Sequence, residues 1–190
     1  MPVLDNLKQL NEKMKRVPHP LAGESAKTKT LYATGVGMMA SSDDVIDGNE
    51  KAYLENLLLS FDISESLLPA VIARATEGAE TTILALVQSL QTLAHKYAFA
   101  LDLLAMMRVG ESVGAESKEK LKHVVDLMGI TTADVAFIAT FSSACATKSE
   151  VLLSKALMQV QKDRVYIEPA LLKYFYPEIT PVQLRMAAER

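Results

Sequence analysis

The 190-residue chain has a single cysteine, Cys145, and no tryptophan. One cysteine excludes an intrachain disulfide framework and a zinc site built from several cysteines. The net charge of −3 lacks the strongly basic balance that is typical of nucleic-acid-binding proteins. Hydrophobic residues make up 49% of the chain, which is enough for a core without a metal or a disulfide.

Long apolar runs are also missing. The longest stretch without Asp, Glu, Lys or Arg runs from Thr81 to His95 and is interrupted by Gln, Thr and Ser, whereas a membrane span needs about 20 mostly apolar residues. The first eleven residues have no apolar segment behind a basic start, as a signal peptide would. We therefore expect a cytoplasmic protein that has no transmembrane segment and binds no nucleic acid.

Proline is absent between Pro69 and Pro169, and this stretch is rich in Ala, Leu, Met, Lys and Glu. Such a composition favours packed helices, and no hairpin turn between alternating strands is present. We predict an all-α orthogonal bundle of about eight to ten helices. The helices are expected near Leu4–Arg16, Ala26–Ser41, Gly48–Phe61, Ser66–Gly78, Thr81–Leu93, Lys96–Val109, Glu116–Met128, Thr132–Ala146 and Ser149–Gln161, with two short ones after Pro169 and Pro181.

The chain divides into three parts. Residues 1–29 are expected to form an N-terminal helix and a linker containing His19, Pro20 and Gly23, and residues 30–161 form the bundle. Residues 162–190 form a helical tail that holds four of the chain's eleven aromatic residues. We expect the tail to pack on the bundle, with contact to a partner as the alternative.

An internal repeat is predicted inside the bundle. Met38-Met39 and Met106-Met107 each end a helix, and each pair is followed by a polar loop and a similar apolar pattern. The offset between the copies is 68 residues before the loop and 67 after it. The matched positions after the loop are Ile46, Leu54, Leu57, Leu58, Phe61 and Ile63 in one copy, and Val113, Leu121, Val124, Val125, Met128 and Ile130 in the other. A helix–loop–helix duplication predicts one bundle with pseudo-two-fold symmetry.

The first of these loops is acidic. Asp43, Asp44, Asp47 and Glu50 lie within eight residues that contain no base. The spacing of Asp47 and Glu50 fits a helix capping box, which explains two of the four acids. Asp43 and Asp44 are not needed for capping, and a bound hard cation would relieve the repulsion among the carboxylates. We therefore regard the four acids as a candidate metal site for Ca²⁺, Mg²⁺, Mn²⁺ or Zn²⁺, beside the alternative of a solvated cap.

The EF-hand pattern does not apply to this loop. Val45 stands at its third position, and Leu54 stands where the bidentate Glu is required.

Around this loop the chain resembles the TerB-like helical domain, a family named for tellurite-resistance proteins and found also in membrane-anchored J-domain co-chaperones. The resemblance covers about residues 30–161 and rests on a helix that ends in Met38-Met39, the run from Asp43 to Glu50, and the exit Phe61-Asp62-Ile63-Ser64. Duplication of the unit is also a family property. The resemblance implies a non-catalytic scaffold or binding module linked to stress from metals or oxyanions.

The chain departs from the family pattern at several positions. Asp44 stands where the family has Gly, and the second loop has lost its leading acid because it reads Gly110-Glu111-Ser112-Val113. Ser117 stands at the position equivalent to Glu50. If metal is held by acids from both loops, only the first half of that set is intact.

Two side chains, those of Ser112 and Cys145, could act as nucleophiles. Gly110 to Gly114 matches the Gly-x-Ser-x-Gly elbow with Ser112 as nucleophile, but that motif needs a preceding strand. Cys145 has small neighbours and no adjacent base, which is typical of a buried thiol.

We therefore expect a binding or scaffold module that is not an enzyme and has no certain cofactor. It is expected to have a protein partner, and a homodimer is possible. The alternatives are a serine hydrolase using Ser112 and a purely structural interaction domain without a ligand.

Overall fold

The computed structural model describes residues 17–40, 46–110 and 115–188 of the chain. Within these residues it is all-α, which confirms the predicted fold class. The helix expected at residues 4–16 lies outside the described residues. The α-helices are α2 (Ala26–Ala40), α3 (Gly48–Ser60), α4 (Leu68–Glu77), α5 (Glu80–Ser89), α6 (Leu93–Val109), α7 (Ala115–Leu127), α8 (Thr132–Thr147), α9 (Glu150–Asp163), α10 (Pro169–Phe175) and α11 (Pro181–Ala188), and a 3₁₀ turn at Glu65–Leu67 precedes α4.

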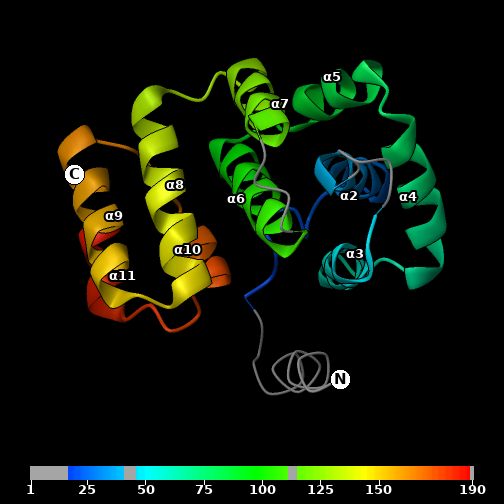
Figure 1. The fold of residues 1–190 in the computed structure, drawn as a ribbon. Helices are drawn as coiled ribbons and strands as arrows, with labels where there is room; N and C mark the ends of the chain where they lie inside the picture. The colour runs from blue at the N-terminus through cyan, green and yellow to red at the C-terminus, as the bar shows by residue number, and fades with distance from the viewer. Residues whose placement is uncertain (1–16, 41–45, 111–114, 189–190) are drawn as a thin grey trace.

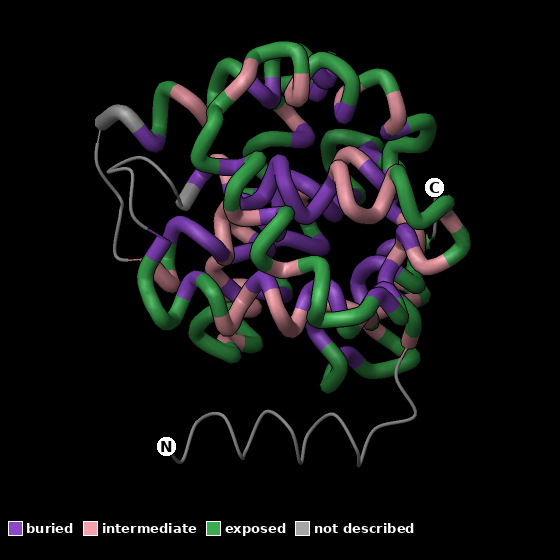
Figure 2. The backbone as a smooth tube through the Cα atoms, turned by 90° about the vertical axis from the view of Figure 1, so that its right-hand side faces the viewer, coloured by how far each residue is buried: buried purple, intermediate pink, exposed green. Residues whose placement is uncertain are grey.

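The helices form two groups with α6 between them. In Figure 1, α2 to α5 lie on one side and α8 to α11 on the other, while α6 runs through the middle and contacts both. The axes of α2 and α3 point towards the viewer, whereas α4, α8 and α9 run along the page, so the helices cross steeply. Figure 2 shows the buried backbone in the interior and exposed residues around it. This arrangement makes α6 the most enclosed helix of the described fold.

Polar side chains fix where several helices begin. Asp47 caps α3, and Thr131 caps α8 in a capping box with Asp134. Each box satisfies main-chain N–H groups that the first turn of a helix leaves without partners. At the other end, α4 and α7 are followed by Gly78 and Gly129 with φ of 62° and 66°, a left-handed conformation that costs glycine little. The predicted capping box at Asp47 and stop at Gly129 are thus present.

Three of the predicted boundaries were wrong in detail. Ser66 does not cap α4, because Ser64 caps the preceding 3₁₀ turn and α4 follows without a side-chain cap. Helix α5 ends at Ser89 instead of Leu93, since Thr92 caps the start of α6. Helix α6 accordingly begins at Leu93, three residues before the predicted Lys96.

Two glycines in α2, Gly35 and Gly37, allow close helix packing. A Cβ atom on Gly35 would overlap the Leu86 side chain of α5 and touch the ring of Phe99 on α6. A Cβ atom on Gly37 would crowd Ala75 of α4 at 3.0 Å. Both positions therefore bring the α2 backbone against its neighbours.

The C-terminal tail packs on the second group of helices. Helix α11 contacts α9, and the Gln161 amide nitrogen of α9 donates to the Met186 carbonyl oxygen at 3.0 Å. Leu171, Leu172 and Tyr176 of the tail are buried in the core. The aromatic cluster of the tail thus contributes to the interior of this chain.

The same contacts recur 67 residues apart in α2–α3 and α6–α7. Lys29 Nζ donates to the Phe61 carbonyl oxygen at 3.2 Å, and Lys96 Nζ donates to the Met128 carbonyl oxygen at 2.7 Å. The spacing of 67 therefore also occurs before the loop, at Lys29 and Lys96, whereas the Met38-Met39 and Met106-Met107 pairs are 68 residues apart. It also relates the helix caps Ser25 and Thr92, and the buried residues Glu50 and Ser117. The duplication and the pseudo-two-fold relation of its copies stay predictions.

Candidate functional site

The described half of the predicted acidic site is a helix N-terminus. Asp47 Oδ1 accepts the main-chain N–H groups of Asn49 and Glu50 at 2.7 and 2.8 Å. Glu50 Oε2 accepts the N–H of Asp47 at 2.9 Å. Two negative charges at the start of a helix also interact favourably with its dipole. The two acids are therefore positioned by α3 itself.

Glu50 differs from Asp47 in its burial. Asp47 is exposed, whereas Glu50 is only 3% exposed. The Glu50 carboxylate lies against Gly110, the C-terminal cap of α6, where a Cβ atom would overlap it unless the Glu50 side chain moved. Glu50 therefore connects the start of α3, which follows the acidic loop, with Gly110, which begins the loop between α6 and α7.

The other predicted site residues cannot be placed. Asp43 and Asp44 lie outside the described residues, as does Ser112. Among the residues that are described, no group of three or more His, Cys, Asp or Glu side chains is arranged to hold a metal ion. The four-acid site therefore stays a prediction. The structure describes two of its four residues, Asp47 and Glu50.

The described residues do not support Ser112 or Cys145 as a nucleophile. A nucleophile elbow requires a strand directly before the serine. The element that precedes Ser112 in the chain is helix α6, which ends at Val109. Cys145 is half-buried in α8, and burial raises the pKa of its thiol to about 12. A thiol with such a pKa is protonated at neutral pH and is a poor nucleophile.

A buried carboxylate at the centre of the fold was not predicted. Asp102 of α6 is 2% exposed and accepts three hydrogen bonds from other elements. Tyr32 of α2 donates to Oδ2 at 2.6 Å, and Tyr53 of α3 donates to Oδ1 at 2.8 Å. His19 Nε2 lies 3.2 Å from Oδ2. Three donors compensate the loss of water around this buried charge.

Aromatic rings enclose His19 beside this carboxylate. The imidazole has edge-to-face contacts with Tyr32, Phe61 and Tyr174 at ring-centroid distances of 5.4, 4.6 and 4.8 Å. Burial, together with the nearby Asp102 charge, raises the pKa of Tyr32 and of Tyr53 well above 10. Both phenols are therefore neutral donors at physiological pH.

The ligand types Asp, Tyr and His suggest a metal site, but the hydrogen bonds oppose that interpretation. The Leu21 main-chain N–H donates to His19 Nδ1 at 3.0 Å, so Nδ1 carries no proton. The proton of the neutral ring is then on Nε2, which donates to Asp102. A nitrogen that carries a proton has no lone pair for a metal. The cluster is thus a closed hydrogen-bond network in this state.

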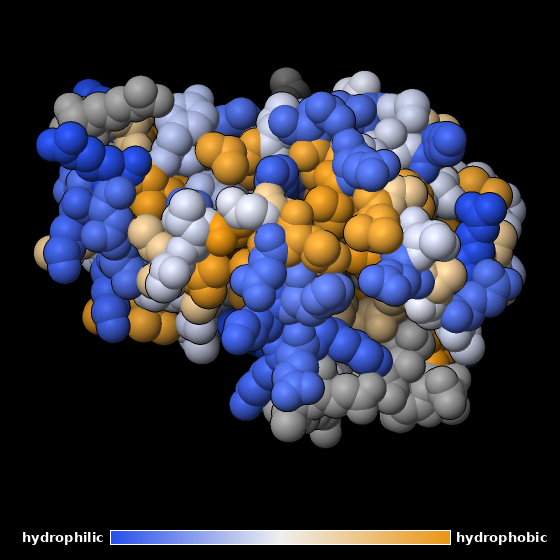
Figure 3. Space-filling view, turned by 90° about the horizontal axis from the view of Figure 1, so that it is seen from above, coloured by the Kyte–Doolittle hydropathy of each residue, from blue (hydrophilic) through white to orange (hydrophobic). Residues whose placement is uncertain are grey.

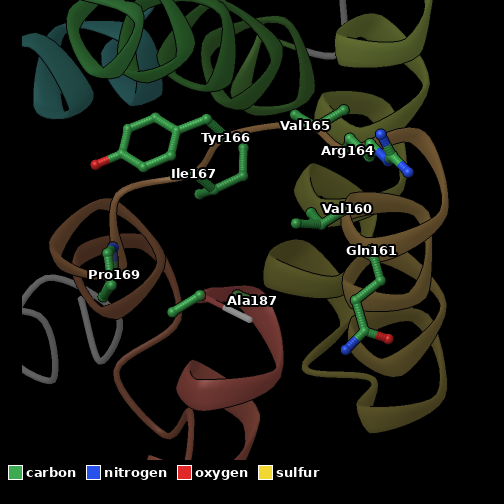
Figure 4. Close-up of a pocket in the computed structure, with 9 residues that line it drawn as sticks. Val160, Gln161, Arg164, Val165, Tyr166, Ile167, Pro169 and Ala187 are labelled. Atoms are coloured by element: carbon green, nitrogen blue, oxygen red, sulfur yellow. The ribbon is translucent and has the colours of Figure 1, made fainter. Parts of the chain in front are cut away.

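A cavity of about 890 Å³ lies among α9, α10, α11 and the segment between α9 and α10 (Figure 4). Val160, Ile167 and Ala187 form its apolar wall, and Arg164 lies at its edge. Among the residues that the structure describes, its lining contains no carboxylate, histidine, cysteine or serine. Such a lining suits binding better than acid–base or nucleophilic chemistry.

No helix in the described ranges combines the length and the apolar character needed to cross a bilayer.

Comparison of the chain with protein-family models, with curated proteins and with solved structures finds no match.

Proposed function

We propose that the chain is a non-enzymatic, TerB-like binding module that takes a divalent cation at the loop from Asp43 to Glu50. The observation that carries the proposal is the pairing of Asp47 with buried Glu50 at the start of α3. Both acids are held in place by main-chain hydrogen bonds before any ligand arrives. Asp43 and Asp44 precede them by a few residues and would complete an all-oxygen ligand set.

Asp47 has coordinating capacity left. Its Oδ1 accepts both capping hydrogen bonds, and its Oδ2 has no hydrogen-bond partner within the described ranges. The residue is exposed, so a cation can reach it from solvent. Carboxylate oxygens of this kind are the ligands that Ca²⁺ and Mg²⁺ prefer, and we expect these two ions ahead of Mn²⁺ and Zn²⁺.

Calorimetric titration with the four cations tests the proposal. The variant Asp43→Asn/Asp47→Asn removes two charges, and Asn still caps a helix well, so the fold should persist while binding is lost. A matched control is Glu119→Gln/Asp126→Asn, which removes two exposed acids from α7. No heat in the natural chain, or equal heat in the loop variant, contradicts the proposal.

An interaction surface for a protein partner is the second candidate function. Viewed from the side where α5 and α7 lie, apolar surface gathers near the middle of the face (Figure 3). Leu84, Leu93 and Leu127 of α5, α6 and α7 are 41%, 44% and 36% exposed. Exposed apolar patches often mark interaction sites. Sedimentation velocity of the natural chain and of Leu84→Glu/Leu127→Glu tests the homodimer form, and a monomer at all concentrations removes it.

A further inference from the structure

The segment 17–25, which we call the strap, carries His19 into the centre of the fold. Its main-chain hydrogen bonds in the described structure are local, with Ala22 donating to the His19 carbonyl oxygen and Glu24 to that of Leu21. Side chains attach it to the helices, because His19 and Leu21 are fully buried or nearly so, and Glu24 lies 3.8 Å from His95. Buried side chains, and not main-chain hydrogen bonds, therefore attach the strap to the helices, as in many bound peptides.

Apart from the Leu21 N–H of the strap, which donates to His19 Nδ1, the groups around the His19 ring come from other elements. Tyr32 comes from α2, Phe61 follows α3, and Asp102 comes from α6. Tyr174 and Phe175 of α10 close the far side, at 4.8 and 6.4 Å from the imidazole centroid. We call this set the socket. Tyr32 and Tyr53 hold the Asp102 carboxylate by hydrogen bonds that do not involve the strap.

We propose that the socket is an imidazole-binding site, which the chain fills with its own His19 and which binds an imidazole from outside when His19 is absent. The N–H of a neutral imidazole donates to Asp102 Oδ2, as His19 Nε2 does. The ring edges and faces of the aromatic walls fit a flat five-membered ring, since edge-to-face contacts stabilise such pairs. An engineered cavity in a protein core can bind a small molecule that fits it, and here the Asp102 carboxylate adds an acceptor for the imidazole N–H.

The test is chemical rescue of the full-length variant His19→Ala. Thermal unfolding is measured at pH 8, where free imidazole is mostly neutral, with increasing imidazole or 4-methylimidazole. The expected result is a rise in Tm of about 3–5 °C for each tenfold increase in ligand above its Kd. Thiazole, a five-membered ring without an N–H donor, should raise the Tm much less.

Two variants serve as controls. His95→Ala removes a second buried histidine, which lies on α6 and whose charged partner among the described residues is Glu24 at 3.8 Å; the Tm of this variant should not respond to imidazole. His19→Ala/Asp102→Asn lacks the acceptor and should lose the rescue. If His19→Ala does not fold alone, its refolding yield from urea with and without imidazole replaces the Tm. Absence of an imidazole effect in either readout, or an equal effect in His95→Ala, overturns the proposal.

Discussion

The carboxylate of Glu50, in the first turn of α3, lies directly against the backbone of Gly110 at the end of α6. The contact joins two loops that are 60 residues apart in the sequence, and it leaves no room for a side chain on Gly110. Because Gly110 has a φ of −82°, its backbone is one that any residue adopts. The requirement for glycine is therefore steric.

Gly110→Ala should destabilise the protein by about 1–3 kcal/mol, since the added methyl overlaps Glu50. Urea unfolding measures the change. Gly48→Ala is the matched control, because a Cβ atom there meets nothing within 4 Å, and it should be neutral. The cost of Gly110→Ala should shrink on a Glu50→Ala background, and equal costs on both backgrounds would refute the contact.

Asp102→Ala should cost about 3–5 kcal/mol, because it leaves the hydroxyls of Tyr32 and Tyr53 and the His19 N–H buried without their acceptor. Tyr53→Phe removes one donor only and should cost about 1–2 kcal/mol. Asp126→Ala, which removes an exposed carboxylate of α7, is the control. A loss below about 1 kcal/mol for Asp102→Ala would show that the network does little for stability.

Stability should fall as the pH rises above about 10. The pKa values of Tyr32 and Tyr53 are raised in the folded state, whereas unfolded tyrosine ionises near 10. Between these values the folded chain binds more protons than the unfolded chain, so the free energy of unfolding decreases with pH. Absorbance at about 295 nm follows the phenolates, and Tyr32 and Tyr53 should ionise only with unfolding. A loss of stability that is the same in Tyr32→Phe/Tyr53→Phe would contradict this origin.

Cys145 should be alkylated slowly in the folded protein. Burial raises its pKa to about 12, so the thiolate, which is the reactive form, is scarce at pH 8. We expect the rate with iodoacetamide to be at least ~100-fold lower than in urea, where the pKa is near 8.5. Mass spectrometry of timed samples gives both rates, and similar rates would mean that the thiol is accessible.

Lys29→Met and Lys96→Met should have similar costs of about 1–2 kcal/mol. Each removes a charged donor to a carbonyl oxygen at a helix end, Phe61 in one case and Met128 in the other. Lys122→Met, an exposed residue of α7, is the control. Costs that differ by more than about 2 kcal/mol would oppose equivalent roles for the two lysines.

Local signals allowed most of the helices to be predicted from the sequence. Asp47 with Glu50, Gly129, and Thr180 before Pro181 each act on main-chain groups a few residues away, so their effect is contained in short stretches of sequence. The boundary between α5 and α6 was harder to predict, because Thr92 lies inside an apolar stretch that could continue as one helix. The Thr92 side chain caps α6 instead, and α5 ends at Ser89.

The Asp102 network could not be derived in the same way. Its donors are 83, 70 and 49 residues distant in the chain, and no local pattern links them. One signal was present, since Asp102 is the only charged residue between Tyr97 and Met107. A single acid on an otherwise apolar helix indicates a buried, hydrogen-bonded carboxylate, although its partners follow only from the fold.

The same separations bear on the order in which the chain folds. The Asp102 carboxylate does not have all three of its hydrogen-bond donors until the strap, α2 and α3 have packed against α6. Burying the carboxylate earlier would remove it from water without compensation, and long loops must close before these contacts form. The centre of the fold is therefore expected to dehydrate last, as a late step that follows assembly of the surrounding helices.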